Sequence, residues 1–216
     1  MMDLHGGTEL DVTVLGFRKP DFDLGSWKFV SMGRYVSAAL FSDDIASFFN
    51  EFTDEYFIMG NDDVVLTNEF DHKFLEEIIE TVREIPNFGR IWLTRGSLST
   101  YGGSSVVKDF GDYQIAELKQ SAPYRLSLQY SLWKTSYFKK YLTKGLSPWA
   151  WELRSTAVND GAAILIPVNR FVVSIGHFMK KGILLKNWHK SIYGDGELKP
   201  DEIEICKTIL TKHGYL

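Results

Sequence analysis

Several features that often reveal a protein's function are missing from this sequence of 216 residues. It has a single cysteine, Cys206, so no disulfide can form within the chain, which fits a reducing compartment. No run approaches the roughly 18 uninterrupted apolar residues that a membrane helix needs. The first residues, 1–7, lack the basic and apolar regions of a signal peptide. We therefore expect a cytoplasmic protein with no membrane span.

The sequence also lacks the short motifs of the best-defined enzyme classes. It contains no P-loop, no Gly-x-Ser-x-Gly elbow, and neither a His-Glu-x-x-His nor a Cys-x-x-Cys pair. The net charge of −4 argues against a large nucleic-acid footprint, because such surfaces are usually basic. Two lysine-rich stretches, 134–144 and 180–190, are compatible with a local basic patch, although such runs are usually solvated faces.

The composition is that of a folded domain, with 44% hydrophobic and 14% aromatic residues. Short apolar segments alternate with amphipathic ones, which indicates an α/β fold with an open mixed sheet flanked by helices. We expect one domain over residues 1–216, because no repeat, low-complexity tract or linker interrupts the pattern. Strands are predicted at 10–15, 27–31, 56–59, 90–94, 115–118, 124–128, 162–166 and 171–175, helices at 37–49, 71–83, 133–142, 148–158 and 200–210, and a mobile Gly/Ser-rich loop at 97–112.

The most informative stretch is 56–66, an apolar run that ends in the adjacent carboxylates Asp62 and Asp63. Acids at the carboxyl end of a buried strand lie where open α/β sheets bind ligands. Adjacent carboxylates repel each other, so a cation or strong donors must offset their charge. Mg²⁺ and Mn²⁺ prefer such hard oxygen ligands. The alternative is an ordinary turn, in which Asn61 and Asp62 cap the next segment.

A second unusual stretch, 147–153, places an acid beside two tryptophans at the start of a predicted helix. The faces of Trp149 and Trp151 are suitable platforms for sugar rings or bases. Aromatic surroundings also suit Glu152 to the role of a general base. The alternative is that both tryptophans belong to the core and that the helix dipole favours Glu152 in the first turn.

Two weaker candidates complete the set. His177 closes a predicted strand, where it is either a metal ligand, a pH-sensitive contact or a satisfied structural residue. Ser127 and Gln129 alternate with apolar residues just before a predicted helix. They either face a pocket or form the solvated side of a strand.

Taken in order, these motifs resemble small bacterial and phage glycosyltransferase-like proteins of the A-type, metal-dependent fold. The resemblance spans roughly residues 10–200 and depends on the combination, since each motif alone is only moderately specific. The matching residues are 56–63, Asp71, Ser127 with Gln129, Trp133-Lys134, Ser147-Pro148-Trp149 with Glu152, and His177 with Lys181-Gly182.

The resemblance implies that a sugar is moved from a nucleoside-diphosphate donor to an acceptor hydroxyl with the help of Mn²⁺ or Mg²⁺. Asp63 would be the direct metal ligand, supported by Asp62, and His177 would complete the metal shell. Glu152 would contact or deprotonate the acceptor hydroxyl. The donor and acceptor would also contact Gln129, Trp149, Trp151 and Lys181.

The chain departs from the family at its beginning. A-type glycosyltransferases usually start with a strand and helix that hold the nucleotide base, whereas this sequence begins at what looks like the second strand. We therefore expect a truncated nucleotide-binding part, supplied by residues 1–16 in shortened form or completed by a second chain. Two alternatives follow: a catalytically degenerate fold that acts as a binding or inhibitory module, and a phage-type enzyme that glycosylates hydroxymethylated DNA bases.

Overall fold

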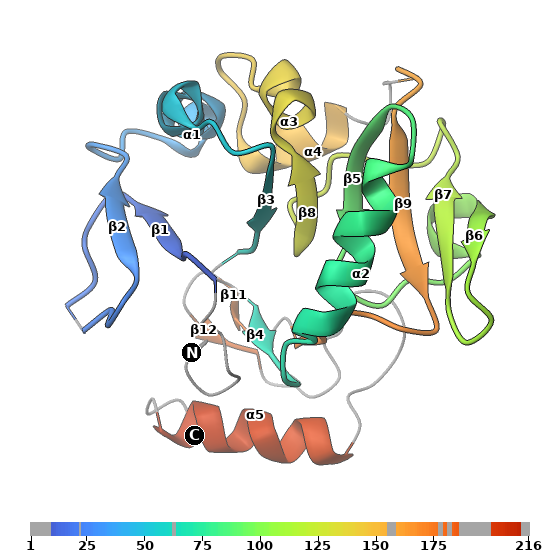
Figure 1. Cartoon of the computed structure of the whole chain (residues 1–216). Helices are drawn as coiled ribbons and strands as arrows, with labels where there is room; N and C mark the ends of the chain where they lie inside the picture. The colour runs from blue at the N-terminus through green and yellow to red at the C-terminus, as the bar shows by residue number, and fades with distance from the viewer. Residues whose placement is uncertain are drawn as a thin grey trace.

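The computed structural model describes residues 10–21, 23–61, 64–154, 159–176, 179–180, 183–185 and 200–212. Its centre is a six-stranded mixed sheet in the order β3-β8-β5-β9-β7-β6 (Figure 1). The strands are β3 (Tyr56–Met59), β8 (Ser131–Lys134), β5 (Phe88–Trp92), β9 (Ala163–Val168), β7 (Gln114–Leu118) and β6 (Ser104–Asp109). The predicted α/β class with an open mixed sheet is confirmed.

The strand directions define the edge of the sheet that matters for function. β5 and β9 are parallel, while β8 runs antiparallel to both of its neighbours, β3 and β5. β3, β5 and β9 therefore run the same way, and their carboxyl ends lie at one edge of the sheet. The amino end of β8 reaches the same edge, which is called the carboxyl edge below.

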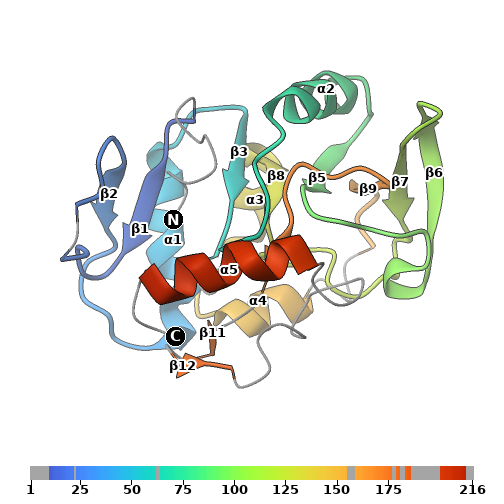
Figure 2. The ribbon, with the colours of Figure 1, turned by 90° about the horizontal axis from the view of Figure 1, so that it is seen from below.

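Helices cover both faces of the sheet. α2 (His72–Arg83) lies on one face, where Phe74 and Ile78 pack against Ile91 and Leu165. α4 lies on the opposite side of the sheet from α2 (Figure 2). The apolar cluster on that side draws on three helices, α1 (Phe41–Glu51), α3 (Thr135–Tyr141) and α4 (Pro148–Arg154).

The remaining elements are small. β1 (Thr13–Gly16) and β2 (Lys28–Ser31) form a separate parallel pair, and β4 (Val65–Leu66) pairs antiparallel with β10 (Ile175–Gly176). α5 (Pro200–Lys212) packs Cys206 against Leu184 and Leu185. The other short elements are η3 (Ala38–Leu40), η4 (Thr100–Gly102), β11 (Met179–Lys180) and β12 (Ile183–Leu184). Within the described ranges, no helix is both long and apolar enough to cross a membrane.

Two segments differ from the prediction. The expected loop 97–112 contains β6, a full strand paired with β7. Gly102 and Gly103, which suggested a loop, take positive φ values of 87° and 109° in the tight turn just before that strand. The expected strand 124–128 is a series of turns instead, because Tyr124 adopts a left-handed φ of 58° and the N–H of Ser127 bonds back to its carbonyl at 2.9 Å.

Several element boundaries also differ from the prediction by a few residues. Trp133 belongs to β8 rather than to the helix that follows it. Of the expected strand 171–175, only Ile175 is in a strand, in β10. The N–H groups of Val172 and Val173 instead both donate to the Leu93 carbonyl, at 2.9 and 3.0 Å. This segment therefore crosses the end of β5 rather than extending the sheet.

Candidate functional site

Glu152 links α4 to the segment that leads into β8. The helix starts at Pro148, a residue suited to the first helical position, and the Ser147 hydroxyl accepts from the Ala150 N–H at 3.2 Å. One turn further on, the Glu152 carboxylate accepts a hydrogen bond from the Leu128 backbone N–H at 2.6 Å. Leu128 lies in the segment that leads into β8. The structure thus joins two of the predicted motifs, the Ser-x-Gln segment and the Trp-x-x-Glu segment.

The backbone of Gln129 is fixed on both sides. Its N–H donates to the Ser127 hydroxyl at 3.3 Å, and its carbonyl accepts from the Ser131 hydroxyl at 2.7 Å. The residue is partly buried and directly follows the Leu128 amide that binds Glu152. Gln129 therefore sits on a rigid stretch of chain next to the Glu152 carboxylate.

Arg90, a buried arginine on β5, anchors segment 124–131. Arg90 has no exposed surface, and its Nε donates to the Ser131 hydroxyl at 2.9 Å. Its Nη1 donates to the carbonyls of Arg125 and Tyr124, at 3.1 and 3.5 Å. One guanidinium therefore contacts both ends of segment 124–131. Sequence reasoning missed Arg90, although a lone arginine inside the apolar run Phe88–Trp92 is a usable signal.

The Glu152 carboxylate on α4 offsets the positive charge of Arg90. Burial lowers the pKa of Arg90 to about 9, and the Glu152 carboxylate is the strongest influence in the opposite direction. The guanidinium is thus charged at neutral pH, inside the protein. An uncompensated buried charge costs several kcal/mol, so a nearby carboxylate stabilises this arrangement.

The acidic segment begins beside the same stretch. β3 ends at Met59, and Gly60 packs so closely on Tyr130 that a Cβ there would lie 2.3 Å from the ring. Burial raises the pKa of Tyr130 to about 12, so its hydroxyl stays protonated at physiological pH. The chain therefore leaves the sheet after Met59 beside Tyr130, at the carboxyl edge.

Four of the predicted site residues, Asp62, Asp63, His177 and Lys181, lie outside the described residues. Their described neighbours give indirect information. Val65 follows Asp63 by two residues, Gly176 directly precedes His177, and Val65 and Gly176 are partners in the antiparallel β4–β10 pair. β4 and β10, which follow Asp63 and precede His177 in the sequence, are therefore adjacent in the fold. Within the described ranges, no cluster of His, Cys, Asp or Glu side chains could hold a metal ion.

The two tryptophans of α4 have different environments. Trp151 is 1% exposed, packs on Trp133 and Phe138 with ring centroids 5.8 and 5.3 Å away, and donates from Nε1 to the Tyr141 carbonyl at 3.0 Å. Trp151 is therefore a core residue, as the alternative interpretation of the sequence expects. Its indole presents no face to a ligand at the surface. Trp149 is 65% exposed and keeps its face available.

Asp71, another residue of the resemblance, has a structural role. Its Oδ1 caps α2 by accepting from the Phe74 N–H at 2.9 Å, and its Oδ2 pairs with Arg170 at 3.0 Å. Arg170 also pairs with Glu77 at 3.0 Å and stacks on the Phe74 ring, 4.2 Å from its centroid. These contacts fix the start of α2 against the chain that follows β9.

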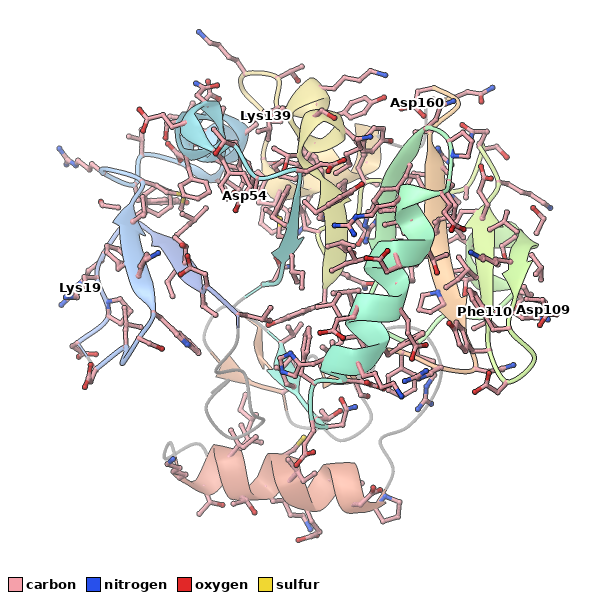
Figure 3. The ribbon with its side chains drawn as sticks, viewed as in Figure 1. Lys19, Asp54, Asp109, Phe110, Lys139 and Asp160 are labelled. Carbon is pink, nitrogen blue, oxygen red and sulfur yellow. The ribbon has the colours of Figure 1, made fainter. Side chains whose placement is uncertain are left out.

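The β1–β2 pair carries a pocket of its own. The pocket has a volume of about 270 Å³. It is lined by Lys19, Asp23, Leu24, Gly25, Trp27 and Phe29. Lys19 extends from the outer side of this pair in Figure 3. The β1–β2 pair is thus a small parallel unit with two aromatic side chains, one basic and one acidic side chain around a pocket.

No protein-family model matches the chain, and no curated protein or solved structure matches it either. The resemblance to A-type glycosyltransferases therefore stays a prediction.

Proposed function

We propose that this protein is a glycosyltransferase that moves a sugar from a nucleoside-diphosphate donor to an acceptor hydroxyl, with help from a divalent metal. The observation that carries the proposal is the hydrogen bond between Leu128 and Glu152, which brings α4 to the segment before β8. Gly60, which precedes Asn61-Asp62-Asp63 in the sequence, packs on Tyr130 of the same segment. Ligands of open α/β sheets bind outside the carboxyl ends of the strands, and Gly60 directly follows the carboxyl end of β3.

Each residue has a role in this proposal. Glu152 accepts the proton of the acceptor hydroxyl, while Gln129 and the exposed face of Trp149 position the acceptor. Asp63 and His177 would hold Mn²⁺ or Mg²⁺, and Asp62 and Lys181 would contact the donor. The pairing of Val65, two residues after Asp63, with Gly176, directly before His177, supports this assignment. When bound, the metal supplies charge that stabilises the leaving diphosphate.

The donor's nucleotide needs a further surface, and the β1–β2 unit offers one. Trp27 and Phe29 provide aromatic faces for a base, and Lys19 provides a positive charge. We therefore place the truncated nucleotide-binding part in this unit. In that arrangement the chain needs no partner to complete the site, although a second chain remains the alternative.

Thermal unfolding with and without Mn²⁺, across a panel of nucleoside-diphosphate sugars, tests the proposal. A donor at ~100 times its dissociation constant adds about 2.7 kcal/mol to the free energy of unfolding. We expect a rise in Tm that requires both the metal and one donor, and Asp63→Ala should abolish it. Asp54, an exposed acid just before β3, provides the matched control, and Asp54→Ala should respond as the wild type does (Figure 3).

Two results would contradict the proposal. An unchanged donor response in Asp63→Ala would remove the metal role of the acidic pair. No response of the wild type to any donor would favour the binding or inhibitory module instead. Strongly salt-dependent binding of duplex DNA would identify a nucleic-acid acceptor.

A further inference from the structure

Arg90 occupies the centre of a cross-strand group on the α4 side of the sheet. β5 and β8 are antiparallel, with Arg90 opposite Trp133 and Trp92 opposite Ser131. Residues two apart on a strand, and residues directly opposite each other, share a face, so these four side chains lie together. The Arg90 Cζ lies 4.8 Å from the Trp133 ring centroid and 5.3 Å from that of Trp92. The two indoles therefore restrict the guanidinium on the apolar side.

The donors of Arg90 are directed at segment 124–131. Nη1 binds the Arg125 carbonyl near its start, and Nε binds the Ser131 hydroxyl at its end. The Ser131 hydroxyl passes this restraint on, because it accepts from Arg90 and donates to the Gln129 carbonyl at 2.7 Å. Leu128, whose N–H binds Glu152, lies between these two anchors.

The arrangement requires an arginine rather than any cation. A guanidinium is a planar fork with five donors, whereas a lysine ammonium is a point charge on a flexible stem. Arg90 uses two of its nitrogens on groups that lie six residues apart in the chain. A lysine at this position retains the charge that balances Glu152 but cannot reach both anchors at once.

We propose that Arg90 is a positioning residue of the candidate site, which holds segment 124–131 so that the Leu128 N–H and Gln129 meet Glu152. Its catalytic consequence rests on the proposed function, but the geometry itself can be tested without any substrate. Arg90 touches neither donor nor acceptor in this view, and it acts through the backbone of the segment.

The first test is amide hydrogen exchange, which reports local opening residue by residue. In Arg90→Lys, we expect the Leu128 amide to exchange about tenfold faster relative to the Ile78 amide in α2. Arg170→Lys is the matched control, because Arg170 is also anchored by polar contacts but lies on the α2 side. It should leave the exchange rate of the Leu128 amide at the wild-type value. An unchanged ratio in Arg90→Lys, or equal acceleration of both amides, would overturn the proposal.

Ser131→Ala keeps the test decisive if Arg90→Lys does not fold. This change removes the link from Arg90 to the Gln129 carbonyl and leaves the guanidinium in place. We expect the same selective acceleration at Leu128. Its absence in a folded Ser131→Ala protein counts against the proposal as directly as the first result.

Turnover provides the second readout. For a donor that the wild type uses, Arg90→Lys should lower kcat by about 10²-fold and leave the donor KM unchanged, as expected for a small misplacement of the catalytic group. An unchanged kcat would overturn the positioning role. If the wild type uses no donor, the proposed function fails, while the exchange ratio still decides whether Arg90 holds the segment.

Discussion

Gly60 and Tyr130 pack with no room for a side chain between them, since a Cβ on Gly60 would lie 2.3 Å from the Tyr130 Cζ. This contact joins the end of β3 to the residue that precedes β8. The position therefore needs glycine for close approach rather than for an unusual backbone conformation. It also sets where the chain leaves the sheet after β3.

Gly60→Ala should lower the free energy of unfolding by about 1–3 kcal/mol, because overpacking forces a buried ring to move. Urea denaturation measures the effect. Tyr130→Ala makes the room that the new methyl group needs, so the double variant should be more stable than the sum of the two single changes predicts. Tyr130→Phe keeps the ring and should give no such recovery. Strict additivity in Gly60→Ala/Tyr130→Ala would show that the contact does not exist.

Glu152→Gln tests the double role of this carboxylate. The amide keeps an acceptor for the Leu128 N–H but loses the charge that faces buried Arg90. Hydrogen bonds to charged groups contribute about 1.5–3 kcal/mol, and we expect a stability loss within that range in chemical denaturation. Sugar transfer at saturating donor should fall by about 10²–10⁴-fold, the usual contribution of a general base.

The two outcomes for Glu152 separate its roles. Normal transfer in a destabilised Glu152→Gln protein would leave Glu152 as a structural acceptor only. Lost transfer with unchanged stability would show that the carboxylate contributes nothing to holding Leu128. Asp54 is an exposed acid outside the site, so Asp54→Gln controls for the loss of one negative charge.

The two tryptophans of α4 should respond in opposite ways to removal. Trp151→Ala empties a fully packed core position and should cost about 3–5 kcal/mol of stability. Trp149→Ala removes an exposed ring and should change stability by no more than about 0.5 kcal/mol, while it weakens acceptor binding. Denaturation curves and acceptor KM values measure the pair. A Trp149→Ala variant with unaltered acceptor KM would exclude that ring from the site.

Local sequence signals were sufficient for some elements and not for others. α2 was predicted within one residue, because its cap at Asp71 and the spacing of Phe74, Ile78 and Val82 are both local. β3 was predicted at its observed bounds, since its apolar run is enclosed by turn residues. β6 was missed, because its Ser-rich sequence becomes a strand only through pairing with β7, a tertiary contact.

The site shows the same division. The contact of Glu152 with Leu128 was not predicted, because no local pattern places α4 beside the segment before β8. Arg90 was not predicted at all. Its acceptors include the carbonyls of Tyr124 and Arg125, 34 and 35 residues away, and backbone carbonyls leave no mark in a sequence. Buried arginines that bind backbone therefore become visible only once the fold is known.

Asp160 should govern part of the acid stability of the protein. It lies at the end of the sheet opposite the carboxyl edge, just before β9 (Figure 3). Its largely buried carboxylate accepts from the Tyr141 hydroxyl and from the Ala162 N–H, and lies 3.4 Å from the buried Arg125 guanidinium. Burial alone would raise the pKa of Asp160, but these hydrogen bonds and the charge of Arg125 outweigh it and hold the pKa below its usual 3.8.

The sign of the pH effect follows from that direction. A carboxylate with a lower pKa in the folded state stabilises the protein fully above its unfolded pKa of about 3.9. This contribution is lost as the pH falls below that value and through the lower folded pKa. Asp160→Asn leaves Arg125 without its carboxylate and should cost about 3–5 kcal/mol at neutral pH. The variant's unfolding free energy should also fall less steeply below about pH 4. Urea denaturation between about pH 7 and pH 2 checks both expectations, and parallel curves for the two proteins throughout that range would contradict the assignment.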